Sequence, residues 1–464
     1  MTTARQRALD LLAFIDHAPT AFHATEQTAA RLASAGFEEL REQDAWRLSP
    51  GDRRYVLRNG SSIVAFVVGA SAPESAGFIM AGAHTDSPVL KLKPCAGYEK
   101  HGYRQLGVET YGGLLLSTWL DRDLGLAGRV VAEGPGDHVA SHLVHIDRPI
   151  ARIPNIAIHL NREVNTKGLV LDQQKHLPPI LGMAEGRDEQ QALLELLSTE
   201  LAKQGVEAGP ETIVDFDLAL VDVQPGSLGG VHEEFLWAPR IDNLASCHAA
   251  LTALIESAAS QPATAATRCL ALWDNEECGS RSMQGAQGPF LRQVLGRVVQ
   301  ARSPKALQAV DRAFASSFLV SVDMAHALHP NYADRHEPEH RPMLGKGPVI
   351  KHNANQAYAS DAISASRFAR ACRAIGCTPQ RFVVRSDMPC GSTIGPITAA
   401  LTGIKTVDVG NPMLSMHSIR ETAAVADHAV MIGALEQLFG TKDTVTKSGK
   451  VAKKKRSRKI KLVS

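Results

Sequence analysis

Cys269-Leu270-Ala271-Leu272-Trp273, followed at once by Asp-Asn-Glu-Glu at 274–277, is the stretch that decides the fold class. A short continuous apolar run of this length is typical of a strand buried on both faces of a sheet. Glu276 and Glu277 then lie at the carboxyl end of a buried strand, where unpaired ionised carboxylates are costly. Such a pair indicates a metal ion or a catalytic proton nearby. The alternative is a solvated corner, which is the more common setting for two adjacent acidic residues.

A second apolar run, Gly77 to Gly82, leads into His84-Thr85-Asp86-Ser87-Pro88. An imidazole that binds a metal generally donates its other ring N–H to a carboxylate or a carbonyl oxygen, so Asp86 suits the role of orienting His84. Asp86 and Pro88 are also common turn formers, and an ordinary turn is the alternative.

Three further residues occupy related positions. Asp323 directly follows the apolar run 318–322, and His417 lies beyond the apolar run 404–409 and a Gly-Asn-Pro turn. Asp242 precedes an amphipathic helical segment, where a simple N-cap worth about 1 kcal/mol is the alternative.

The alternation of strands and helices predicts an α/β fold, in which ligands bind at the carboxyl ends of the strands. We expect one cluster there, formed by His84, Asp242, Glu276, Glu277, Asp323 and His417. Imidazole and carboxylate ligands without a thiolate suit a pair of divalent ions, with zinc first and manganese or cobalt as alternatives. They argue against a structural zinc site, which prefers cysteines.

Six stretches carry a family resemblance: the chain resembles the aspartyl aminopeptidases, co-catalytic metallopeptidases that remove N-terminal residues from peptides. The stretches are Ala-His-Thr-Asp-Ser-Pro at 83–88, Arg-Ile-Asp-Asn at 240–243, Asp-Asn-Glu-Glu at 274–277, Ser-Val-Asp-Met-Ala-His at 321–326, Lys-His-Asn-Ala-Asn-Gln at 351–356 and Met-His-Ser at 416–418. They follow the family's order across nearly the whole chain.

The resemblance implies a role for each ligand. His84 and Asp323 would hold one metal ion, Glu277 and His417 would hold the other, and Asp242 would bridge the two.

The resemblance also implies that Glu276 is the general base, which takes a proton from a bridging water and passes it to the leaving amine. Asp86 would orient His84.

Four more residues are placed around the substrate by the resemblance, together with Glu276 and Asp323: His159, His326, Lys351 and Tyr358. Single residues of these types are otherwise ordinary surface or core residues, which is the alternative for each. A buried ammonium group at Lys351 needs an anion, so we expect a preference for acidic (Asp or Glu) N-terminal residues.

The sequence between His84 and Asp242 supplies no ligand. It contains short β-like runs at Gly128–Ala132, Ser141–Ile146 and Ile156–Leu160 and a helical run at Asp188–Lys203. We therefore expect a catalytic domain with a central mixed sheet flanked by helices, formed by residues 1–94 and 236–440. An inserted, mostly β domain at 95–235 interrupts it. The resemblance implies that the insertion dimerises as part of a homo-oligomer and brings His159 to a neighbour's active site.

Composition fits a soluble enzyme, with 464 residues, 44% hydrophobic and 21% charged. The amphipathic stretch Thr3–Asp16 lacks the core of a signal peptide, and no apolar run has transmembrane length. We expect a cytoplasmic protein with reduced cysteines and no membrane partner.

Nine of the 50 Lys and Arg residues lie in Lys447–Ser464, so we predict a disordered basic tail at 441–464. A solvated extension is favoured there over a nucleic-acid-binding segment.

Two other functions stay open. Related di-metal scaffolds serve carboxypeptidases and amino-acid deacylases, which assays on N-acyl amino acids would distinguish from aminopeptidases. The chain could also be a non-catalytic assembly protein of the same fold, although the intact Glu276 and the full set of ligands oppose this.

Overall fold

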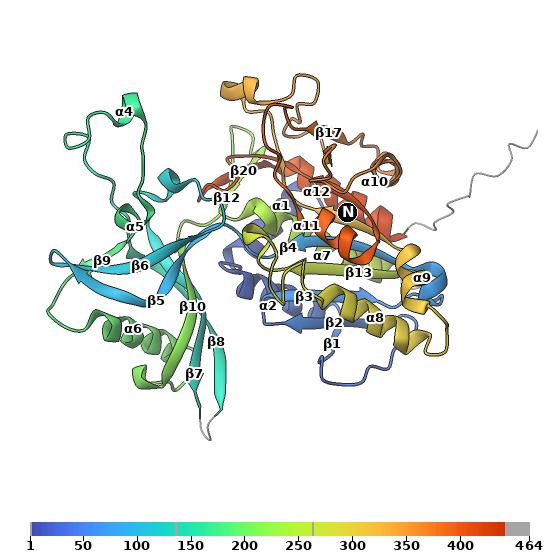
Figure 1. The fold of residues 1–464 in the computed structure, drawn as a ribbon, viewed down its shortest axis with the longest axis horizontal. Helices are drawn as coiled ribbons and strands as arrows, with labels where there is room; N and C mark the ends of the chain where they lie inside the picture. The colour runs from blue at the N-terminus through green and yellow to red at the C-terminus, as the bar shows by residue number, and fades with distance from the viewer. Residues whose placement is uncertain (1, 135–137, 262–263, 441–464) are drawn as a thin grey trace, which may run out of the picture.

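A nine-stranded mixed sheet forms the centre of the computed structural model, which describes residues 2–134, 138–261 and 264–440. The predicted basic tail, 441–464, lies outside the described residues. In Figure 1 this sheet crosses the right-hand half of the molecule. Its strands, in spatial order, are β1 (Glu38–Glu39), β2 (Arg53–Arg58), β3 (Ser62–Val67), β13 (Thr267–Trp273), β4 (Phe78–His84), β14 (Phe318–Val322), β18 (Lys405–Gly410), β16 (Val349–His352) and β17 (Gln380–Val383).

The four strands β13, β4, β14 and β18 run parallel to one another in the middle of this sheet, whereas β3 and β16 flank them in the antiparallel sense. Every residue of β13, β4 and β14 is buried, as expected for parallel strands covered on both faces. Because parallel strands end at the same edge, the residues that follow these strands are brought together.

Helices cover both faces of the central sheet. Along β4, Ile79 and Ala81 pack into one helical layer, and Phe78 and Met80 pack into the other. The first layer contains α1 (Ala4–Asp16), α2 (Ala21–Ser34), α7 (Ile241–Ser260), α10 (Ala362–Ala374) and α12 (Val425–Gly440). The second contains α8 (Phe290–Arg302), α9 (Ala309–Ala315) and α11 (Ile394–Thr402).

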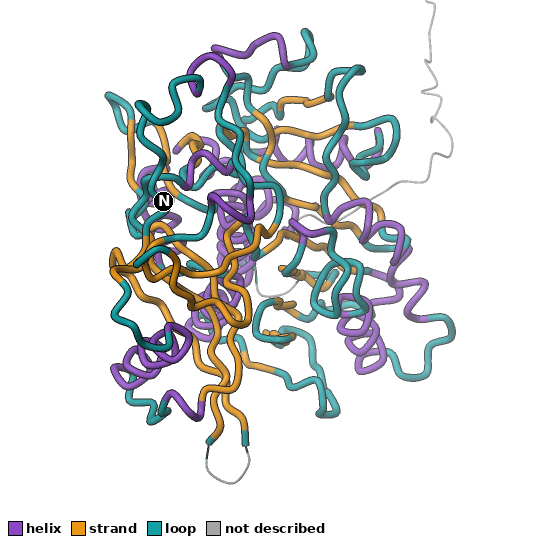
Figure 2. The backbone as a smooth tube through the Cα atoms, turned by 60° about the vertical axis from the view of Figure 1, so that its left-hand side comes forward, coloured by secondary structure: helices purple, strands orange, loops and turns teal. Residues whose placement is uncertain are grey.

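A six-stranded sheet with its own hydrophobic core lies to one side of the central sheet, at the left in Figure 1. Figure 2 shows its long antiparallel strands side by side. Its strands are β8 (Val139–Ala151), β7 (Leu124–Glu133), β10 (Ile213–Asp222), β5 (Val89–Lys100), β6 (Tyr103–Tyr111) and β9 (Ile180–Met183), and α6 (Glu189–Lys203) packs on it. The molecule therefore has the predicted α/β fold, with a mixed central sheet and an inserted β region.

One predicted strand of the insertion is wrong. Residues 156–160 form an exposed turn between β8 and the short helix α4 (Val164–Lys167). Ile156, Ile158 and Leu160 alternate as they would in a strand, yet all three are exposed, with Leu160 at 77%. The predicted boundaries of the insertion, 95 and 235, stay a prediction, because the smaller sheet itself runs from Val89 to Asp222.

A third, five-stranded sheet combines strands that follow the six-stranded sheet in the sequence with strands that follow β14 and β18 of the central sheet. It consists of β11 (Ser227–Gly229), β12 (Phe235–Ala238), β20 (Glu421–Ala424), β19 (Pro412–Leu414) and β15 (Ala325–His326). No helix in the described part of the chain is long and apolar enough to cross a bilayer. The seven cysteines all lie in described residues and are free.

Candidate active site

Three parallel strands bring acidic and histidine side chains to one edge of the central sheet. His84 is the last residue of β4, and Asp323 follows β14 directly. After β13, Asn275 adopts a left-handed conformation (φ 64°), which starts the 3-10 turn η3 (Glu276–Cys278). Asparagine tolerates this conformation better than most residues, so it turns the chain sharply and leaves Glu276 and Glu277 at the strand end.

Asp242 comes from the beginning of α7 and does not cap this helix. Its backbone is non-helical (φ −81°, ψ 106°), and no side-chain capping hydrogen bond is formed at this end. Its side chain instead lies between His84 and His417. The N-cap alternative for Asp242 is therefore wrong.

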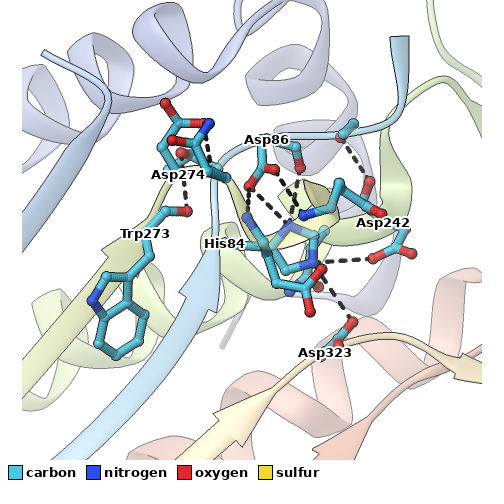
Figure 3. Close-up of polar contacts among 12 residues, drawn as sticks. His84, Asp86, Asp242, Trp273, Asp274 and Asp323 are labelled. Carbon is cyan, nitrogen blue, oxygen red and sulfur yellow. Dashed lines mark hydrogen bonds and ion pairs between the residues drawn. The ribbon is translucent and has the colours of Figure 1, made fainter. Parts of the chain in front are cut away.

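The two carboxylate oxygens of Asp242 face different partners. Asp242 Oδ1 lies 3.6 Å from His84 Nε2, which lies 3.8 Å from Asp323 Oδ1. Figure 3 marks both contacts with dashed lines. Asp242 Oδ2 lies 3.3 Å from His417 Nε2, which lies 3.4 Å from Glu277 Oε1. The side chains thus form two groups that share Asp242.

The charges of this cluster fit cations. Burial and the nearby carboxylate of Asp242 raise the pKa of Glu277 to about 7, although His417 opposes the shift. Burial also acts on His417, but hydrogen bonds to Asp242 and Glu277 outweigh it and raise its pKa to about 11. Both pKa shifts reflect an excess of carboxylates in the cluster, which a bound cation would balance.

Two further observations support a metal site. Ligand atoms of His84, Asp242 and Glu277 all lie within 4.8 Å of one another. Asp242 Oδ1 is buried and has no hydrogen-bond partner in the described part of the chain. Oxygen and imidazole donors without sulfur are the ligands of zinc, manganese or cobalt in open, catalytic sites.

Asp86 lies beneath the cluster, buried at 4% exposure. Its backbone carbonyl accepts a hydrogen bond from His84 Nδ1 at 3.0 Å, and its carboxylate lies 3.4 Å from the same nitrogen. Two oxygens of this carboxylate also accept the backbone N–H groups of Glu276 and Glu277, each at 3.1 Å. Asp86 therefore fixes the ring of His84 and the turn that carries both glutamates.

Glu276 is half-buried beside the ligands. Burial, together with Asp323, Glu277 and Asp86, raises the pKa of its carboxyl group to about 8, against the opposing effect of His84. Its position beside the ligands suits a group that takes part in proton transfer.

A cleft with a volume of about 180 Å³ opens over the cluster. Every predicted site residue except Asp86 and His159 lines it, namely His84, Asp242, Glu276, Glu277, Asp323, His326, Lys351, Tyr358 and His417. Lys351 is buried (3% exposed), with its Nζ donating to Met324 O at 2.9 Å and lying 3.6 Å from Asp323 Oδ2. The same ammonium lies 5.3 Å from the centre of the Tyr358 ring. Burial and Lys351 lower the pKa of His326, which favours a neutral imidazole.

His159 does not line the cleft of its own chain. It lies in the exposed turn at 156–160 of the smaller domain, between the exposed side chains of Ile158 and Leu160.

Two residues that contact the cluster were not predicted from the sequence. Glu421 is buried, and its carboxylate accepts the backbone N–H groups of Asp242 at 2.9 Å and His417 at 2.7 Å. Tyr111, at the end of β6, donates its hydroxyl to Asp86 Oδ2 at 2.5 Å. Gly112 and Gly113, which follow Tyr111, indicate a close approach of the backbone to neighbouring residues.

The fold places a set of potential metal ligands at the carboxyl ends of a mixed sheet, an arrangement suited to a metal-dependent hydrolase. Residues 14–439 match the family described as aminopeptidase I zinc metalloprotease (M18), and the chain belongs to this family.

Known relatives agree over almost the full length. The probable M18 family aminopeptidase 2 of Azotobacter vinelandii is 46% identical over 431 residues, which covers 93% of this chain and 97% of the relative. The protein of the same name from Pseudomonas aeruginosa is 44% identical, covering 93% of this chain and 98% of the relative.

Solved structures give the same result. A chain of the cryo-EM structure of the Ape4 and Nbr1 complex matches with a TM-score of 0.90 and 41% identity, covering 94% of this chain and 86% of that chain. The structure of the S. cerevesiae mApe1 dodecamer matches with a TM-score of 0.81 and 30% identity, covering 93% and 96%. The chain is thus an M18 aminopeptidase, a hydrolase of a zinc metalloprotease family.

Proposed function

We propose that this aminopeptidase removes acidic (Asp or Glu) N-terminal residues from peptides with two divalent metal ions, as an aspartyl aminopeptidase does. The observation that carries the acidic preference is the buried ammonium of Lys351 in the cleft beside the cluster. A buried cation that already faces the cleft attracts a carboxylate more strongly than a neutral side chain of the same shape.

The ligand groups assign the two ions. His84 and Asp323 would hold one ion, Glu277 and His417 would hold the other, and Asp242 would bridge them through its two oxygens. Zinc is favoured by the family description, with manganese or cobalt as alternatives. When bound, the ions would polarise the peptide carbonyl and lower the pKa of a water molecule.

Glu276 is the proposed general base. Its carboxylate takes a proton from the attacking water and transfers that proton to the leaving amine nitrogen, so that the same group acts as base and then as acid.

His326, Lys351 and Tyr358 are proposed to hold the N-terminal residue. Asp323 and Lys351 lie close together, so an ion bound to Asp323 would leave the ammonium free for a substrate carboxylate. Tyr358 is buried with its ring against this ammonium.

His159 is proposed to complete the active site of a neighbouring subunit. The exposed apolar side chains around it, Ile156, Ile158 and Leu160, are the composition expected of a surface that another copy covers. A related chain is a dodecamer in its solved structure. We therefore infer a homo-oligomer that forms through the inserted domain and works in the cytoplasm on peptides.

The test is a panel of aminoacyl p-nitroanilides arranged as matched pairs, Asp with Asn and Glu with Gln. A charge-assisted hydrogen bond is worth about 1.5–3 kcal/mol, so kcat/KM should favour the acidic member by roughly 10- to 150-fold. Lys351→Met should abolish this ratio, whereas Lys346→Met, which alters an exposed lysine nearby, should leave it unchanged.

Equal rates on both members of each pair would refute the acidic preference and leave the aminopeptidase activity standing. N-acyl amino acids serve as the second panel. Turnover of these compounds, with none of the anilides, would indicate a deacylase or carboxypeptidase instead. No turnover of any compound by the metal-loaded protein would favour a non-catalytic assembly protein.

A further inference from the structure

Tyr111-Gly112-Gly113, at the end of β6, contacts Asp86 beneath the cluster and two of the proposed ligands, Glu277 and His417. We propose that this segment positions the catalytic turn and the ligands, so that the inserted sheet supplies part of the active-site framework within the same subunit. The inference rests on the proposed function, because it assigns positioning residues to that same site.

The first contact is the hydroxyl of Tyr111. It donates to Asp86 Oδ2 at 2.5 Å, and the Asp86 carboxylate in turn accepts the backbone N–H groups of Glu276 and Glu277. Hydrogen bonds to a buried ionised carboxylate are strong and directional. Tyr111 thus sets the orientation of the group that holds the turn with both glutamates.

The second contact is made by Gly112. Its backbone has φ 73°, and a Cβ atom added here would lie 3.1 Å from Glu277 Cβ and 3.4 Å from Pro88 Cα. A side chain would therefore be strained in its backbone conformation and would press on the residue proposed to hold the second ion. Only glycine lets the segment approach Glu277 this closely.

The third contact is the carbonyl oxygen of Gly113, which accepts a hydrogen bond from His417 Nδ1 at 2.9 Å. This bond leaves Nε2 of the same ring facing Asp242 and Glu277. A ligating histidine depends on such a partner to fix its tautomer and its ring orientation.

Other contacts keep the segment in place. Asn275 Nδ2 donates to the Tyr111 hydroxyl at 3.1 Å, and Lys91 Nζ lies 3.9 Å from the centre of the Tyr111 ring. Asn275 begins the catalytic turn, whereas Lys91 belongs to the smaller sheet. The tyrosine is therefore held from both domains.

Tyr111→Phe tests the first contact, because it removes the hydroxyl and keeps the ring. Tyr103→Phe is the matched control, since it removes an exposed hydroxyl from the opposite end of the same strand. We expect Tyr111→Phe to lower kcat roughly 10- to 100-fold with KM little changed, and to speed the loss of zinc to a chelator by a similar factor. The control should match the wild-type protein in both measurements.

Gly112→Ala tests the second contact and should also accelerate zinc loss. Its control is Gly102→Ala, at a glycine of the same hairpin with φ 80°, where an added Cβ atom has no neighbour within 4 Å. The two substitutions share the backbone strain and differ in the contact with Glu277. Equal zinc loss in both variants would therefore attribute the effect to strain alone and overturn the proposal for Gly112.

Asp86→Asn combined with Tyr111→Phe tests whether Tyr111 acts through Asp86. The double variant should lose no more kcat than Asp86→Asn alone, because residues that act in one chain of contacts are not additive. Additive losses would overturn this route. If Asp86→Asn does not fold, Tyr111→Phe is still compared with Tyr103→Phe. Equal kcat and equal zinc loss in these two variants would overturn the role of Tyr111. Zinc release is measurable even if the wild-type protein lacks peptidase activity, so a failure of the proposed function is distinguishable.

Discussion

Glu276→Gln is the change that most directly tests the mechanism. Glutamine keeps the shape of the side chain and cannot accept the proton. The backbone N–H of residue 276 would still donate to Asp86, so the catalytic turn keeps its hydrogen bonds. Glu276 is also not a member of the compact ligand group His84, Asp242 and Glu277, so metal binding should persist.

The magnitude follows from the setting of Glu276. General-base catalysis contributes about 10²- to 10⁴-fold, which is roughly 3–5 kcal/mol of the barrier. We expect a loss near the upper end, because Glu276 is half-buried beside the ligands and glutamine cannot take up the proton. KM should change little, since Lys351 and Tyr358 stay in place.

Steady-state kinetics on an aspartyl anilide and metal analysis of the same sample check this prediction. Glu277→Gln is the matched control, because its side chain lies 3.4 Å from His417 Nε2 within the ligand group and its loss should lower the metal content. Near-normal turnover of Glu276→Gln would refute the role of Glu276 as the base. If Glu276→Gln lost its metal and Glu277→Gln kept it, the assignment of the two glutamates would be refuted.

Three more predictions follow from the site and the core. A chelator should abolish peptidase activity, and zinc, manganese or cobalt should restore it; full activity in a metal-free sample would contradict the metal mechanism. Mixed oligomers of inactive Glu276→Gln and His159→Ala chains should regain part of the activity, because some sites then receive an intact half from each chain; unchanged inactivity in proven mixed oligomers would exclude the shared site. Burial lowers the pKa of His23 to about 3, so below pH ~6.5 the unfolded chain gains a proton that the folded chain does not bind. The resulting loss of stability, about 2 kcal/mol at pH ~5 from this residue, should appear as a lower urea midpoint that His23→Gln makes less dependent on pH.

Much of the fold and of the cluster could be predicted from the sequence because the two signals are local. The mostly apolar runs within β4, β13 and β14 predict buried strands, and the carboxyl ends of parallel strands lie at one shared edge of the sheet. His84, Glu277 and Asp323 were found in this way, although their roles as ligands stay predictions.

The errors come from patterns whose meaning depends on distant parts of the chain. Ile156, Ile158 and Leu160 alternate like a strand, but no strand among the described residues pairs with them and their side chains are exposed. Asp242 has the sequence context of an N-cap, yet Glu421 takes its backbone N–H and the side chain turns to the histidines. A local rule fails in both cases because a tertiary contact, or the lack of one, decides the outcome.

The position of the insertion in the sequence explains why the smaller sheet can influence the cluster. The chain leaves the central sheet at His84-Thr85-Asp86, enters β5 at Val89, and returns through β12 just before Asp242. Ser87 Oγ donates to the carbonyl oxygen of Asp242 at 2.7 Å and so joins the departing and returning segments. A displacement of the smaller sheet would therefore move His84 and Asp242 together. Both residues are proposed ligands of the first metal ion. An insertion at another loop of the central sheet would lack this connection, so its placement between the first two ligands ties the geometry of the cluster to the smaller domain.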